Sequence, residues 1–222
     1  MEIREYQLDK LDEARALQQQ CLNLHLPSPP VLHWEYKVSD GNGNIVSAGR
    51  GKANSYTRNA LNILALNLGY PEASHISSSY FQDGYVSIKD VSGTVYSNAS
   101  KMCAISDGYA IVLGYGSATE SLDSYKLAIQ IEGYMGWTIG AQSRTTAFNS
   151  TSRKLITTLT RAFTNSTGGS VGVTEAGMYG QLYVNSSQYY AITVYDVFDA
   201  IAVADGATIT WTYTTEIAYP TP

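Results

Sequence analysis

The feature that most constrains the fold is a succession of short segments, from Gly84 onward, in which apolar and polar residues alternate. Clear examples are "GYVSIKDVSGTVYS", "RKLITTLTRAFTN" and "ATITWTYTTEI", and glycine, asparagine or serine punctuates them. A period of two residues is typical of a strand with one buried face. Many short strands with regular turns predict a mainly β chain, an antiparallel β-sandwich of jelly-roll-like type.

Two helices are expected besides the strands. Residues 1–24 carry apolar side chains every three or four positions, and "NSYTRNALNILALNLGYP" begins at a capping Ser55 and ends at Gly69 and Pro71. The segment "LPSPP" cannot continue the first helix. We therefore expect an N-terminal helical arm with a proline-rich linker over residues 1–30 and a β-sandwich domain over 31–222. The helix either packs on its own domain or serves as an oligomerisation arm, and the sequence leaves both open.

A turn motif separates two expected strands near the start of the sandwich. Residues 31–38 and 45–48 alternate, and "DGNGN" between them has residues that tolerate positive φ. The same five residues match the first part of a calcium loop. The match then fails, because Ile45 stands where that loop needs glycine and Gly51 where it needs glutamate. The motif favours a hairpin turn over a calcium site.

The stretch "FTNSTGGSVGVTEAGMYG" poses a choice between a ligand-gripping loop and a turn. A phosphate cradle needs a helix N-terminus, whereas the residues that follow alternate like a strand. We interpret "STGG" as a hairpin turn in which Gly168 and Gly169 both supply positive φ and Asn165 bonds its own backbone. Glu175 is then structural, bonding backbone amides or pairing with an arginine such as Arg161.

The search for chemistry finds no complete signature. The histidines at positions 25, 33 and 75 have no metal-ligand spacing, and "GYGSA" lacks the following helix that a nucleophile elbow needs. Cys21 and Cys103 are expected as free thiols. We expect no enzyme activity, no cofactor and no metal site.

Charge and hydropathy exclude some partners. The net charge is −5 and only 15% of residues are charged, so a nucleic-acid backbone is not an expected partner. No apolar run approaches about 20 residues, so no membrane-spanning helix is expected. Tyrosine is abundant, with 18 copies against 4 phenylalanines and 3 tryptophans, and tyrosine suits wet contact surfaces.

Three stretches occur in a fixed order along the chain: "VLGYGSATESLD" with "SYKLAIQI", then "TRAFTNSTGGSVGVTEAGMYG", then "VYDVFDAIAVADGATITWTYTTEI". This order resembles structural proteins of tailed viruses of bacteria and archaea, and "KVSDGNGNIVSAGRGKANSYTRNALNIL" is similar to the opening segment of such proteins. The resemblance covers about residues 35–217. It implies a capsid decoration, head–tail connector or tail protein, made in the host cytoplasm and located in the virion, with no catalytic residues.

The expected function is therefore self-association, as a trimer by analogy, and docking on major capsid or tail proteins. The alternative is a carbohydrate- or receptor-binding module of a viral tail, in which exposed Trp137, Trp211 and clusters of tyrosines stack on host glycans. The side chains expected to make contacts are Leu8, Leu11 and Leu17 of the N-terminal helix, together with Trp137 and Trp211 of the sandwich.

Overall fold

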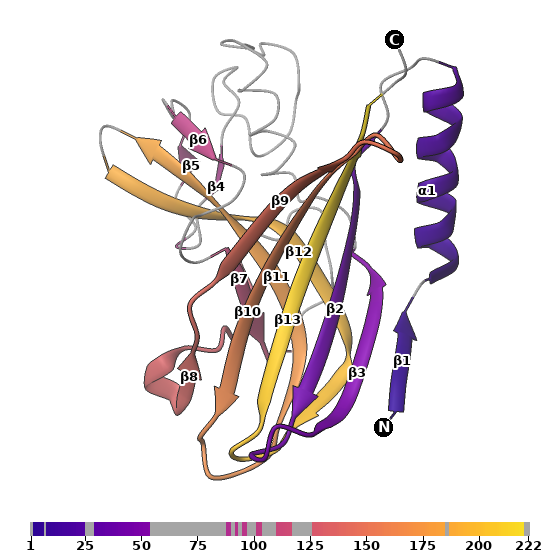
Figure 1. Cartoon of the computed structure of the whole chain (residues 1–222). Helices are drawn as coiled ribbons and strands as arrows, with labels where there is room; N and C mark the ends of the chain where they lie inside the picture. The colour runs from indigo at the N-terminus through magenta and orange to yellow at the C-terminus, as the bar shows by residue number, and fades with distance from the viewer. Residues whose placement is uncertain are drawn as a thin grey trace. The chain divides into compact units, whose positions relative to one another are not determined.

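The structure is a computed structural model of the whole chain (Figure 1). It describes residues 2–6, 8–24, 29–53, 88–89, 92, 95–96, 101–103, 110–116, 126–184 and 187–219. The chain folds into two compact units, each assembled from segments that are distant in the sequence. The first comprises Met1–Ala53, Glu132–Val171 and Ala202–Pro222, and the second comprises Asn54–Ile131 and Gly172–Ile201.

The first unit is built on a seven-stranded sheet with the order β1-β3-β2-β13-β10-β8, in which β9 also pairs with β10. All its pairs are antiparallel except β1 with β3. Figure 1 shows β2, β13 and β10 side by side in the middle. The elements are β1 (Glu2–Tyr6), α1 (Leu8–Asn23), β2 (Val31–Ser39), β3 (Ile45–Lys52), η1 (Gly133–Met135), β8 (Trp137–Ile139), β9 (Ser143–Asn149), β10 (Lys154–Asn165) and β13 (Thr208–Ala218).

The second sheet has four strands. β12 (Ser187–Val203) and β6 (Lys101–Cys103) flank β11 (Val171–Val184), which also pairs with β7 (Ile111–Gly114). The predicted turn near Ser92 is confirmed, because β4 (Ile88–Lys89) pairs with β5 (Val95–Tyr96) in antiparallel register. The predicted fold class is confirmed as a mainly β chain with two larger sheets, as in a β-sandwich, and an N-terminal helix. The expected internal helix from Ser55 onward lies outside the described residues.

Aromatic rings form the core of the first unit. Trp211 of β13 lies against Trp34 and Tyr36 of β2, with ring centroids 4.9 Å and 5.9 Å apart. All three are buried. The rings need two glycines on the neighbouring strand, since a Cβ at Gly49 would lie 2.5 Å from the Tyr36 ring and one at Gly51 would lie 2.7 Å from Trp34. The glycines of "SAGRGK" are therefore packing residues, and not a ligand loop.

The N-terminal prediction needs a correction, because residues 1–24 are not one helix. Residues 2–6 form β1, which pairs in parallel with β3, and the helix begins only at Leu8. The sequence "EIREY" alternates over too few residues to be distinguished from the first turn of an amphipathic helix. α1 then packs on β2 and β3 within the same compact unit (Figure 1). Whether residues 1–30 can be removed without unfolding the rest stays a prediction.

The glycine-rich stretch is a connection between sheets, so the predicted hairpin is wrong. β10 belongs to the seven-stranded sheet and β11 to the four-stranded sheet. Only Gly168 of the "STGG" turn has positive φ, +83°, while Gly169 lies outside the left-handed region. Asn165 accepts a bond from the Thr167 amide at 3.0 Å, as its predicted turn role requires.

Asn165 also ties this connection to the one between β12 and β13. Its side-chain nitrogen Nδ2 donates to the Gly169 and Val203 carbonyls at 2.7 Å and 2.8 Å. Its backbone carbonyl accepts from the Gly206 amide at 2.8 Å. Because Asn165 is fully buried, these bonds satisfy a polar group that would otherwise be costly inside the protein. The stretch therefore holds together the β10–β11 and β12–β13 connections, which gives it a structural explanation.

Candidate functional site

Glu175 is a structural carboxylate, as predicted, and its partners are backbone amides and a tyrosine. The side chain is 0% exposed and accepts bonds from the Gly116 and Ala128 amides, at 3.3 Å and 3.1 Å. Tyr195 donates its hydroxyl hydrogen to the other carboxylate oxygen at 2.7 Å. The alternative partner Arg161 instead donates to the Gly140 carbonyl. Three donors converge on the carboxylate, so the buried group is satisfied by bonds within the same compact unit.

The two glycines of the motif "GYG" make room for this carboxylate. A Cβ at Gly114 would lie 2.7 Å from the Glu175 Oε2 atom, and a Cβ at Gly116 would lie 2.9 Å from it. β7, which ends at Gly114, is buried throughout. The glycines that resembled part of a nucleophile elbow are thus explained by close packing.

A second buried carboxylate, Glu216 of β13, stands in an ionic cluster. Arg15 of α1 donates to its Oε1 atom at 2.6 Å, and the Lys154 ammonium of β10 donates to its Oε2 atom at 2.8 Å. Burial would raise the pKa of Glu216, but the hydrogen bonds from Lys154 and Arg15 outweigh it and lower that pKa. Gln18 of α1 adds a bond to the Glu216 backbone carbonyl at 3.2 Å. The cluster therefore fastens α1 to the sheet.

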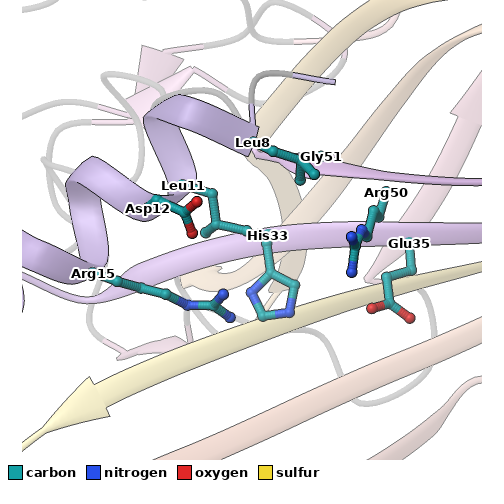
Figure 2. Close-up of a pocket in the computed structure, with 8 residues that line it drawn as sticks. All are labelled: Leu8, Leu11, Asp12, Arg15, His33, Glu35, Arg50 and Gly51. Carbon is teal, nitrogen blue, oxygen red and sulfur yellow. The ribbon is translucent and has the colours of Figure 1, made fainter. Parts of the chain in front are cut away.

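A pocket of about 160 Å³ opens between α1 and the sheet beside this cluster. Figure 2 shows Arg15 and His33 pointing toward each other across it, while Glu35 and Arg50 lie side by side on neighbouring strands. Its lining consists of Leu8, Leu11, Asp12, Arg15, His33, Glu35, Arg50 and Gly51. The lining therefore includes two acidic side chains, Asp12 and Glu35, and two basic ones, Arg15 and Arg50.

His33 forms the floor of the pocket, on β2 as predicted. Its Nδ1 atom lies 3.7 Å from Glu216 Oε1, and it has no hydrogen-bond partner within the described part of the chain. Burial lowers the pKa of His33 and outweighs the nearby Glu216 carboxylate, which raises it. His33 is therefore mainly neutral at pH 7. His25 and His75 lie outside the described residues.

The "DGNGN" motif forms the expected hairpin turn between β2 and β3. Asp40 accepts bonds from the Asn42 and Asn44 amides, each at 2.9 Å, and from the Asn44 side chain at 3.1 Å. The Asn44 side chain and these amides lower the pKa of Asp40. Gly43 has φ of +85°, which glycine adopts without strain. The motif that resembles part of a calcium loop is thus a turn, and the Asp40 carboxylate accepts its hydrogen bonds from residues of the same turn.

The predicted contact residues are dispersed, and the expected exposure of the tryptophans is wrong. Trp137 is only 4% exposed and Trp211 is 0% exposed, because both rings belong to the core. Leu11 is also buried and Leu8 lines the pocket, whereas Leu17 is half exposed on α1. The structure brings Leu8 and Leu11 together but leaves Leu17 apart from that pocket.

The most exposed part of the seven-stranded sheet is β9, in which all seven residues are exposed. Phe148 of β9, Leu155 of β10 and Ile217 of β13 lie in one cross-strand row. Phe148 is 55% exposed, and its ring lies edge-on to Tyr219 with centroids 5.9 Å apart. This apolar row, Phe148–Leu155–Ile217 with Tyr219, is a surface that sequence reasoning missed.

The sequence alone also does not predict the role of Glu216, because its partners are distant in the sequence. Arg15 and Glu216 are 201 positions apart, and nothing local indicates their pairing. The local signal for a buried ion pair is the glutamate in "TYTTEI". It is a charged residue near the end of a strand whose other residues are apolar or threonine. Phe148 lies in a segment for which the sequence pattern predicts no strand.

Comparison with protein-family models, with curated proteins and with solved structures finds no match to this chain. Within the described residues, no group of three or more His, Cys, Asp or Glu side chains is arranged to hold a metal ion. None of the helices described is long and apolar enough to cross a membrane. Cys21 is a free thiol.

Proposed function

We propose that this chain is a structural protein of a tailed virus, a capsid decoration or head–tail connector component that works by self-association and by docking on other virion proteins. The sequence resemblance motivates the viral context. The apolar row at the end of the seven-stranded sheet is the observation that carries the contact role. Phe148 and Ile217 are exposed on the folded sheet, so a partner that covers them removes apolar surface from water and lowers the free energy.

The polar interior supports binding without turnover. Glu175 is held by two amides and a tyrosine, and Glu216 by an arginine and a lysine. A carboxylate that catalyses proton transfer must lie within hydrogen-bond reach of the proton on its substrate. Both buried glutamates instead use their oxygens in internal bonds that stiffen a scaffold.

The glycan-binding alternative loses its two tryptophans, because Trp137 and Trp211 are buried, and keeps only the tyrosines that also motivated it. Aromatic stacking on a sugar needs an exposed ring face. Phe148 and Tyr219 are the exposed rings at the apolar row, and they meet edge-on. This geometry favours a protein contact over a flat sugar platform.

Co-sedimentation with assembled particles tests the proposal. The purified chain should bind particles far better than isolated partner subunits, because a symmetric array raises the effective concentration of each further contact. Salt should weaken this binding only modestly, since apolar contacts are little screened. Ile217→Ser should weaken it, while Ile45→Ser, which changes an exposed isoleucine of β3, should not. A monomer that ignores particles and binds a soluble sugar would overturn the proposal.

A further inference from the structure

The open edge of the seven-stranded sheet fits a second copy of this chain. We propose that two copies pair through β9 in antiparallel orientation, about a two-fold axis at Thr146, so that the two sheets join into one. This inference rests on the proposed function and specifies the self-associating surface. It adds a register and a partner that the apolar row alone does not define.

The chemistry of β9 is that of an unprotected edge. β9 pairs with β10 on one side, and within the described residues no strand pairs with its other side. A strand edge presents a row of N–H and C=O groups that another strand can bond. Natural edges are usually blocked by lysines, prolines or inward charges, whereas "SRTTAFN" holds one charge and no proline. The edge therefore has the features of a pairing surface.

The sequence of β9 is complementary to itself. The antiparallel register that pairs all seven residues places Thr146 opposite Thr146 and Arg144 opposite Phe148. Arg144 and Phe148 lie on the same face, because positions two and four apart in a strand share a face. Each copy would place a guanidinium beside the other copy's exposed ring, a favourable cation–π geometry formed twice. A register centred on Arg144 would oppose two like charges, which is destabilising.

Two-fold pairing would make association through β9 stop at a closed dimer, in place of the trimer expected by analogy. A two-fold interface uses the same strand of both copies, so it leaves no β9 edge for a third copy. The other edge of the sheet is β1, whose sequence "EIREY" has three charges in five residues. That edge is poorly suited to extend the joined sheet. The pair of sheets is therefore a finite assembly and not a fibre.

Cysteine crosslinking tests the register directly. In full-length protein with Cys21 and Cys103 replaced by serine, Thr146→Cys places two thiols opposite each other across the axis. Opposed Cα atoms in antiparallel strands are about 4.5–5.5 Å apart, within the range that a disulfide spans. The matched control is Asn42→Cys, an exposed position in the β2–β3 turn. Under mild oxidation the Thr146→Cys dimer should form on the order of tenfold faster or more, because pairing raises the effective thiol concentration.

A charge swap supplies a second readout that does not depend on disulfide geometry. Phe148→Lys sets a lysine opposite Arg144 of the other copy and should convert the dimer to monomer in sedimentation velocity. Adding Arg144→Glu to that variant should restore the dimer through two cross-strand ion pairs. Circular dichroism checks that each variant is folded.

The outcomes separate this inference from the proposed function. A protein that binds particles or forms oligomers, yet shows no faster Thr146→Cys crosslinking and no effect of Phe148→Lys, overturns β9 pairing and leaves the proposed function intact. A monomer that also ignores particles overturns both. Faster crosslinking with rescue by the double variant establishes the pairing and its register.

Discussion

The two edges of the seven-stranded sheet differ in chemistry and in protection. β1 is short, charged and paired in parallel, and its Glu5 bonds Arg50 of β3 at 2.7 Å. The chain continues from it into α1, which the Glu216 cluster fastens to the sheet. β9 is neutral apart from Arg144, and all its residues are exposed. The difference is one of edge chemistry: charges protect the β1 edge, whereas the β9 edge has the features of a pairing surface.

The largest loss of stability is expected when the ionic cluster that joins α1 to β10 and β13 is broken. Glu216→Ala leaves Lys154 and Arg15 without their carboxylate, and removing one partner of a buried pair costs about 3–5 kcal/mol. Because Arg15 is 41% exposed, we expect a smaller loss of about 2–3 kcal/mol in the free energy of unfolding, measured by urea denaturation. Glu35→Ala, at an exposed position of β2, is the control and should change little. Equal losses of unfolding free energy in the two variants would contradict the stabilising role of the Glu216 cluster.

Glu175 tests whether stability and association can be separated. Glu175→Gln turns an amide N–H toward backbone donors and should cost on the order of 1–3 kcal/mol of unfolding free energy. Asp199→Asn, exposed on β12, is the matched control. Because Glu175 lies in the other compact unit, self-association below the melting temperature should be unchanged. Normal melting together with loss of a hydrolytic activity would show instead that Glu175 is catalytic.

Acid should destabilise the region in which α1 packs on the central strands β2 and β13. The folded-state pKa of His33 is lowered by burial, so the unfolded chain binds this proton more readily and stability falls as pH drops below 6.5. The lowered pKa of Glu216 adds a further loss as pH falls below 4.5. Urea denaturation from about pH 8 to about pH 3 should show both steps, and His33→Gln should remove the first. A flat profile between neutral pH and the onset of the Glu216 step in the parent protein would contradict the account of His33.

The smallest effect on stability is expected at the β1 edge itself. Arg50 and Glu5 are both more than half exposed, and such surface pairs contribute about 0.2–1 kcal/mol. Glu5→Thr should therefore barely change the melting temperature. Combined with Arg4→Thr it removes two of the charges that protect this edge, and should produce larger species in sedimentation velocity. If the neutral edge remains inert, charge is not what keeps β1 from pairing.

What the sequence predicts well is local. The β2–β3 hairpin follows from Asp40 and the asparagines and glycines beside it, because a turn is decided by a few neighbouring residues. The bonding of Glu175 to backbone amides also follows from a short pattern, a glutamate in an alternating segment after a glycine turn. These features need no information about which strands meet.

What the sequence does not predict depends on distant pairing. Alternation in "ATITWTYTTEI" places Trp211 on the apolar face of its strand with Ile209 and Tyr213, but only the topology shows that it packs against Trp34 and Tyr36 of β2. The "STGG" turn has hairpin chemistry, yet its two strands join different sheets. The clamp at Glu216 joins three elements from distant parts of the chain. Such contacts follow from the topology, which alternation alone leaves undetermined.

Hydrogen exchange at the two edges, as a function of protein concentration, tests the central claim most directly. The account predicts that β9 amides become protected as concentration rises and the copies pair, with Thr146 at the centre of the protected segment. β1 amides should exchange at the same rate throughout, because that edge takes no partner. Exchange at β9 that is independent of concentration, in a protein that sediments as an oligomer, would contradict the assignment of this edge as the contact surface.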